Sequence, residues 1–168
     1  MTNDGGKDNF LKLIESNKKI IFKICNSYCR NNAEREDLAQ EIIYNLWRSG
    51  ESFKKDYKFS TWMYRVALNV AISFYRKENK RQTTPLNEHV FNIEDSIGAS
   101  AESEENINLL QKFINDLKEL DRALMILYLE EKSYIEIADI LGISETNVAT
   151  RISRCKEKLK QKFLQHNN

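Results

Sequence analysis

The sequence contains little proline, glycine, histidine and cysteine, and each shortage narrows the class of protein. One proline and five glycines among 168 residues leave few of the turn residues that closely spaced strands require. The long segments instead repeat apolar residues with the 3.6-residue period of a helix. Because no segment shows the strict alternation typical of a strand, we expect an all-α fold.

Long apolar runs and sets of metal ligands are also scarce. No run approaches the roughly 18 apolar residues of a membrane span, and the N-terminus MTNDGGKDNF lacks the apolar core of a signal peptide, so we expect a cytoplasmic location. Cys25 and Cys29 are one helical turn apart, a spacing that suits two metal ligands or two buried thiols. No CxxC pair accompanies them, and His89 and His166 lie in polar or terminal segments. With Cys155, the cysteines are too few for a disulfide framework, so we expect reduced thiols, no metal and no cofactor.

Charge is segregated along a chain whose net charge is only +1. Residues 54–81 hold eight Lys or Arg and two acids, whereas residues 82–105 hold six acids and no Lys or Arg. Affinity for DNA follows the number of phosphates neutralised, so the whole chain is a weak electrostatic binder with two basic modules. Residues 82–106 contain the only proline and lose the apolar periodicity. We expect helical domains at 1–81 and 107–168 joined by a flexible acidic linker, which is either a disordered connector or a segment that occupies a groove on a partner.

The segment SYIEIADILGISETNVATRISRCKEKL, residues 133–159, predicts a helix-turn-helix. Ser133 and Glu136 form a capping box at the start of a helix. Gly142 follows an apolar run and can adopt the left-handed conformation that ends a helix. Ser144 then suits the N-cap of a second helix. The C-terminal domain is therefore predicted to carry a DNA-binding motif.

The second helix of this motif separates apolar from polar side chains. From residue 146 onwards the chain has six Lys or Arg and the single acid Glu157. A charged stripe alone is typical of any solvated amphipathic helix, but the capping, the glycine turn and the basic excess together favour phosphate contact. The predicted buried stripe consists of Val148, Ile152, Cys155 and Leu159. The predicted exposed face consists of Asn147, Thr150, Arg151, Arg154 and Lys158.

The segment EDLAQEIIYNLWR, residues 36–48, predicts an amphipathic helix with an acidic face. We expect a core stripe of Ala39, Ile42, Ile43 and Leu46. The opposite side carries Asp37, Gln40, Glu41, Tyr44 and Arg48. This pattern is typical of an ordinary solvated helix; if it is functional, its partner is a protein with basic groups, since an acidic face repels DNA phosphate.

In residues 53–81, aromatic residues interleave with Lys and Arg. Aromatic rings beside cations can hold unstacked bases, with about 1–3 kcal/mol per base from stacking. Tyr57, Phe59 and Trp62 are the candidates for such contact, whereas Tyr64 and Tyr75 are expected mainly to pack. On the predicted helix, one stripe consists of Trp62, Arg65, Asn69, Ser73 and Arg76. The inward side is expected to consist of Ala67, Leu68, Ala71 and Phe74.

These motifs occur in a fixed order: EDLAQE, then FSTWMYRVALNVA with a basic tail, then the acidic linker, then the helix-turn-helix. In that order they resemble the extracytoplasmic-function group of sigma factors in the sigma-70 family, over nearly the whole chain. The resemblance implies two helical domains with no domain between them. It also implies a non-enzymatic protein whose partners are core RNA polymerase, promoter DNA and an anti-sigma factor, with no small-molecule substrate.

The resemblance further implies a role for individual residues. Docking on the clamp coiled coil of the largest polymerase subunit would use Asp37, Gln40, Glu41 and Tyr44. Recognition and melting of the promoter −10 element would use Lys58, Phe59, Thr61, Trp62, Arg65, Asn69, Arg76 and Lys77. Recognition of the −35 element would use Thr146, Asn147, Thr150, Arg151, Arg154 and Lys158. Ala149 departs from the pattern, because many members have lysine there, so one phosphate contact is missing or comes from a neighbour such as Lys156.

Three other functions compete with this hypothesis. A stand-alone helix-turn-helix regulator leaves the acidic helix and the tryptophan-containing basic stripe unexplained. An enzyme that processes nucleic acid needs clustered carboxylates, and the sequence has no P-loop, GxSxG, HExxH or plausible Cys–His pair. A pure interaction module is disfavoured by the two basic segments.

Overall fold

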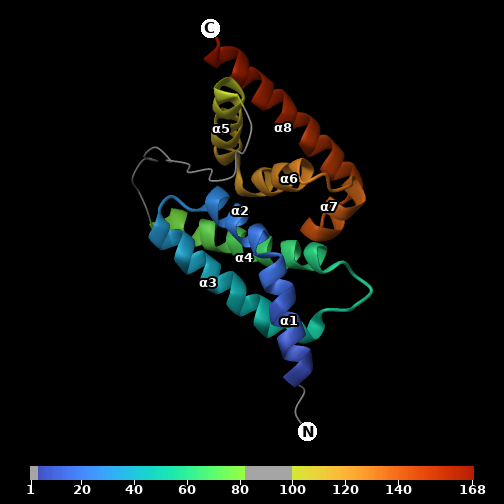
Figure 1. Ribbon diagram of the computed structural model, residues 1–168. Coiled ribbons are helices and arrows are strands. Elements are labelled where there is room, and N and C mark those ends of the chain that lie inside the picture. Colours follow the sequence, from blue (N-terminus) through green and yellow to red (C-terminus); the bar gives the residue numbers. More distant parts are fainter. Residues whose placement is uncertain (1–3, 82–99) are drawn as a thin grey trace. The chain divides into compact units, whose positions relative to one another are not determined.

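The computed structural model describes residues 4–81 and 100–168, which divide into two compact units at residue 80. All regular structure in these described residues is helical (Figure 1), so the predicted all-α class is confirmed. Of the predicted linker, residues 82–99 lie outside the described residues, and the last part is helix instead, since α5 begins at Ala101. No described helix combines the length and apolarity needed to cross a bilayer.

The first unit contains four α-helices and one short 3₁₀ helix. The start of the third helix is fixed by a reciprocal cap: Asn31 Oδ1 accepts from the Glu34 N–H at 2.9 Å, and the Glu34 carboxylate accepts from the Arg30 N–H at 2.8 Å. Such bonds satisfy backbone donors that have no partner inside the helix. The elements are α1 (Asp4–Ser16), α2 (Lys18–Tyr28), α3 (Asn32–Ser49), η1 (Gly50–Ser52) and α4 (Phe59–Arg81).

The buried side of α3 differs from the predicted stripe at two positions, because Leu38 is buried while Ala39 is only half-buried, and Ile43 is exposed. Leu38, Ile42 and Leu46 are fully buried, whereas Ile43 is 44% exposed. The prediction that Ile43 belongs to the core was therefore wrong, because the inward residues follow a spacing of four and Ile43 lies beside them. From α4, the predicted inward residues Ala67, Leu68 and Ala71 are fully buried, whereas Phe74 is half-buried.

The second unit has its core between α5, α6 and α8. One cluster joins Phe113, Ile114, Leu117, Met125, Cys155 and Leu159. Beside it, Arg122 is only 3% exposed and donates to the carbonyls of Asn115 and Leu117, where α5 ends. A buried arginine is stable there because its guanidinium satisfies carbonyls that the helix leaves without partners. The elements are α5 (Ala101–Asn115), α6 (Glu119–Leu129), α7 (Tyr134–Leu141) and α8 (Glu145–His166).

The turn from α7 to α8 has the predicted local geometry. Ser133 and Glu136 form both bonds of the capping box, at 3.2 and 2.8 Å. Gly142 is left-handed, with φ of 67°, and Ser144 Oγ accepts from the Asn147 N–H at 3.1 Å. The helix-turn-helix prediction is thereby confirmed.

Candidate functional site

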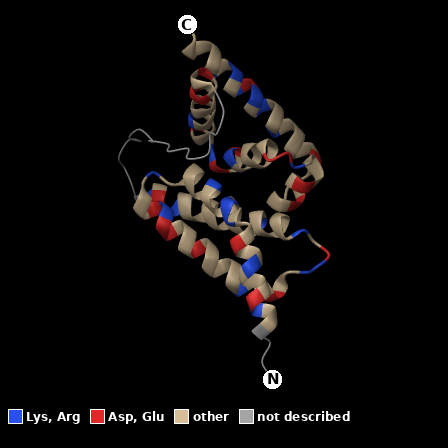
Figure 2. Ribbon diagram, viewed as in Figure 1, with Lys and Arg blue, Asp and Glu red and all other residues tan. Residues whose placement is uncertain are grey.

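The polar face of α8 is largely as predicted. The predicted inward stripe, from Val148 to Leu159, is buried. Basic residues are visible along α8 (Figure 2). Thr150 Oγ1 donates to the Thr146 carbonyl at 3.0 Å, so its hydroxyl oxygen is left to accept from an outside donor. Of the residues predicted to recognise the −35 element, the exposed ones are Thr146, Asn147, Thr150, Arg154 and Lys158.

Arg151 does not lie on that exposed face. Its Nη1 donates to Asp121 Oδ1 of α6 at 2.8 Å, and its Nε donates to Asn147 Oδ1 at 3.2 Å. The Arg151 side chain is 35% exposed and that of Asp121 is 13% exposed. The prediction that Arg151 faces away from the buried stripe was wrong, because three residues after Val148 the helix turns Arg151 to the flank nearest α6. Sequence reasoning missed Asp121 altogether.

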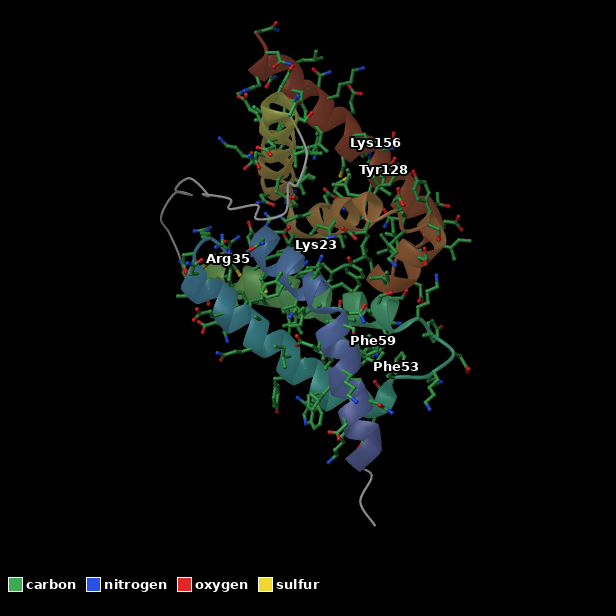
Figure 3. The ribbon with its side chains drawn as sticks, in the orientation of Figure 1. Lys23, Arg35, Phe53, Phe59, Tyr128 and Lys156 are labelled. Atoms are coloured by element: carbon green, nitrogen blue, oxygen red, sulfur yellow. The ribbon has the colours of Figure 1, made fainter. Side chains whose placement is uncertain are left out.

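Lys156, the residue expected to compensate for Ala149, has an internal contact. Its Nζ lies 4.3 Å from the centroid of the Tyr128 ring, and Figure 3 shows the two residues together between α8 and α6. A side-chain hydrogen bond with Tyr128 raises the pKa of Lys156. Its ammonium group is therefore held toward α6, and its role as a phosphate contact stays a prediction.

The outward face of α3 combines acids with exposed apolar side chains. Asp37, Gln40 and Glu41 are exposed, and acidic residues mark this helix in Figure 2. Tyr44 is 62% exposed, and both Ile43 and Trp47 are 44% exposed. Because protein interfaces pair apolar and aromatic centres with polar rims, this face suits a protein partner better than a nucleic acid.

An aromatic cluster fills the space where the loop after η1 enters α4. The ring centroids of Phe53, Phe59 and Trp62 lie 5.3–5.5 Å apart, and Phe10 of α1 is 5.7 Å from Phe59 and 5.8 Å from Trp62. The Phe53 and Phe59 rings meet edge to face, with an interplanar angle of 86°, and both residues are labelled in Figure 3. Phe59 is only 9% exposed, so its ring is not displayed on the surface, and its stacking on a base stays a prediction. Its ring is used by the protein's own packing.

The remaining residues of the predicted −10 surface divide by burial. Thr61 is 8% exposed and Trp62 is half-buried, whereas Tyr57, the other candidate for base stacking, is 53% exposed. Thr61 is therefore not displayed toward a partner as predicted, since the first turn of α4 packs inward with Met63 and Tyr64. The exposed residues of the set are Lys58, Arg65, Asn69, Arg76 and Lys77.

The cysteines are buried and free. Burial raises the pKa of Cys25 to about 12 and that of Cys155 to about 11, and it also raises the pKa of Cys29. Thiols that stay protonated are poor metal ligands and poor nucleophiles. Among the described residues, no three His, Cys, Asp or Glu residues gather as a metal site; His89 lies outside that part of the chain.

Comparison with known proteins agrees with this arrangement. Residues 13–81 match the family model of sigma-70 region 2, and residues 107–159 match that of sigma-70 region 4. The chain is 32% identical to the ECF RNA polymerase sigma factor SigW of Bacillus subtilis, over 95% of this chain and 91% of the relative. It is also 32% identical to the ECF RNA polymerase sigma-E factor of Escherichia coli K12, over 75% of this chain and 72% of that protein.

Solved structures share the fold at lower sequence identity. The sigma factor RpoE, in complex with the anti-sigma factor NepR from Bartonella quintana, has a TM-score of 0.70 at 20% identity, covering 94% of this chain and 95% of that one. CnrH, in complex with the cytosolic domain of CnrY, has a TM-score of 0.67 at 20% identity, covering 98% and 93%. With two sigma-70 regions in order and 32% identity to SigW along almost all of both chains, this chain belongs to the extracytoplasmic-function sigma factors of the sigma-70 family.

Proposed function

We propose that this protein binds core RNA polymerase and directs promoter-specific initiation of transcription. The observation that carries the proposal is the presence of both sigma-70 regions in one chain, region 2 at residues 13–81 and region 4 at residues 107–159. A stand-alone helix-turn-helix regulator does not account for region 2. The role requires binding surfaces and no catalytic group of its own.

The face of α3 is the proposed polymerase-docking surface. Asp37, Gln40, Glu41 and Tyr44 are exposed together on this helix. Carboxylates favour a basic protein partner, and the exposed aromatic ring supplies apolar contact area. Ile43 and Trp47, both 44% exposed, extend this surface beyond the residues that the sequence motif indicated.

The two DNA surfaces have different tasks in this proposal. On α8, exposed donors and acceptors recognise the double-stranded −35 element in the major groove, where one good bidentate contact discriminates by about 1–3 kcal/mol. On α4 and the preceding loop, cations hold the strands of the −10 element while bases leave the stack, at a cost of a few kcal/mol each. Phe59 and Thr61 position this surface from within, and Trp62 lies at its edge. The exposed part consists of Lys58, Arg65, Asn69, Arg76 and Lys77.

Polymerase binding comes first in the proposed sequence of events. With a net charge of +1, the free protein neutralises few phosphates, so its own promoter affinity is weak. The two helical units, the second of which begins its first helix at Ala101, would then engage the promoter from the polymerase surface. An anti-sigma factor, such as the one bound to the structural neighbour RpoE, is a further proposed partner.

Transcription in vitro with purified core polymerase and a genomic library tests this function. Promoter-dependent transcripts are expected with the protein and not without it; none in either case would refute the proposal. The double variant Asp37→Lys and Glu41→Lys tests the docking surface, and we expect its affinity for core polymerase to fall by roughly tenfold or more through charge repulsion. Asp8→Lys with Glu15→Lys on α1 is the matched control, since both acids are exposed and the change in net charge is equal. An equal loss in both double variants would contradict the assignment of α3.

A further inference from the structure

Three polar side chains form a connected chain from α6 to the DNA-facing surface of α8. Asp121 Oδ1 accepts from Arg151 Nη1 at 2.8 Å, and Asn147 Oδ1 accepts from Arg151 Nε at 3.2 Å. The Asp121 side chain is 13% exposed, so the anchor of this chain lies inside the unit. Its far end, Asn147, is exposed.

The chemistry of the guanidinium determines which way the Asn147 amide points. Arginine has five N–H donors and no acceptor, so the amide must turn its oxygen toward Arg151. The amide nitrogen, with two donors, then faces away from Arg151. The main chain at Asn147 is fixed as well, because its N–H donates to the N-cap Ser144 at 3.1 Å. The amide is thus held in one of its two possible orientations.

We propose that Asp121 and Arg151 are positioning residues that hold the Asn147 amide for recognition of the −35 element, which rests on the proposed function. In this orientation Asn147 presents a donor to base-edge acceptors of the major groove, namely purine N7, guanine O6 and thymine O4. Its oxygen is engaged by Arg151, so the two-bond contact that asparagine makes with adenine is disfavoured. Arg151 therefore acts on sequence recognition through Asn147.

Removal of the Asp121 charge is expected to change two measurable quantities, the affinity for DNA of any sequence and the preference for the correct −35 sequence. A carboxylate near a DNA-facing helix repels phosphate, so its neutralisation raises affinity for every sequence alike. Loss of positioning instead lowers the preference for the correct −35 sequence over an incorrect one. A residue with only an electrostatic role would not change that preference.

The test uses the holoenzyme assembled with wild-type, Asp121→Asn or Asp116→Asn protein. The probes are a promoter duplex selected from a random library by the wild-type holoenzyme and the same duplex with its −35 element scrambled. Asp116→Asn is the control because it removes the same charge from another ion pair with α8, to Lys162 at 2.9 Å. We expect Asp121→Asn to lower the ratio of the two affinities roughly fivefold or more, with Asp116→Asn unchanged. An unchanged ratio for Asp121→Asn, or an equal fall for Asp116→Asn, would overturn the proposal.

Arg151→Lys separates positioning from folding. Lysine can still pair with Asp121 but lacks the fork that reaches both partners, so we expect the ratio to fall while the thermal midpoint stays at the wild-type value. In the Asn147→Ala background, Asp121→Asn should change the ratio no further, and a fall as large as in the wild-type background would refute the connection. A wild-type holoenzyme that does not distinguish the two duplexes would refute the proposed function itself; discrimination that survives in all the variants would refute only this inference.

Discussion

Two turns of the second unit place a residue in the left-handed backbone region, and only one of the two is glycine. Gly142 ends α7 with φ of 67°, and Glu131 follows α6 with φ of 58°. At each turn the next N–H donates to a carbonyl five residues back, from Ile143 to Ala138 at 3.2 Å and from Lys132 to Leu127 at 3.1 Å. Because the hydrogen bonding is similar, the two positions together test how much a Cβ atom in the left-handed conformation lowers the free energy of unfolding.

The magnitude follows from two opposing terms. A left-handed L-residue costs about 1–2 kcal/mol, while replacing glycine with alanine removes freedom from the unfolded chain, which is worth about 0.4–1 kcal/mol. A Cβ at Gly142 would meet no atom within 4 Å, so no packing term enters. We therefore expect Gly142→Ala to lower the free energy of unfolding of the second unit by about 1 kcal/mol, and Glu131→Gly to raise it by about 0.5–1 kcal/mol.

Urea unfolding of the full chain, followed by amide hydrogen exchange in α7 and α8, measures these changes where they occur. Both tryptophans, Trp47 and Trp62, belong to the first unit, so tryptophan fluorescence provides an internal reference that should not move. Gly142→Ala as stable as the wild type, or Glu131→Gly less stable, would refute the view that the left-handed geometry sets the stability of these turns.

Two further predictions concern the first unit and the thiols. Gly50→Ala carries no backbone cost, since φ is −58°, but its Cβ would lie 2.9 Å from the Phe10 ring. We expect the Phe10 ring to shift away from Trp47 and Trp62, which changes the tryptophan emission while the far-UV circular dichroism stays the same. An unchanged emission would contradict this packing. The raised pKa values of Cys25, about 12, and Cys155, about 11, mean that above the ordinary value of 9.0 the unfolded chain loses these protons while the folded chain retains them. The free energy of unfolding should therefore fall as pH rises from 9 toward 11. The fall should be less steep in a double variant with Cys25→Ala and Cys155→Ala. Equal slopes would show that these two thiols do not contribute to the pH dependence.

The sequence predicts the helix-turn-helix well because its determinants are local. The capping box joins Ser133 to a residue three positions away, and Gly142 needs only its own backbone conformation to end α7. The buried stripe of α8 follows from helical periodicity once the helix start is known. Each of these features is decided within about one turn of chain, so no knowledge of distant elements is needed.

The features that the sequence did not predict depend on residues far apart in the chain. Asp121 and Arg151 are separated by 30 positions. The helical pattern assigned Arg151 to the exposed face, because periodicity does not say which neighbouring helix lies on its flank. An aromatic residue between Lys and Arg, such as Phe59, looks the same in the sequence whether its ring stacks on a base or packs on Phe10. Only the placement of α1 against the start of α4 distinguishes the two. The sequence gives the angular position of each residue around its helix, but it does not give the residue of another helix that packs against it.

The carboxylate of Asp121 also bears on why promoter binding should depend on the polymerase. An acid beside the recognition helix reduces affinity for any DNA, and Arg151, one of the six cations after residue 146, is partly neutralised by it. The Asp121–Arg151 pair therefore lowers the attraction of α8 for DNA of any sequence, while in our proposal it fixes the orientation of the Asn147 amide. A lower affinity of α8 for DNA does not prevent promoter binding when another contact holds the protein at the promoter, because a tethered module binds at a high effective concentration. In this proposal the face of α3 and the Asn147 amide on α8 complement each other: docking through α3 would supply the tether, and the amide would supply selectivity.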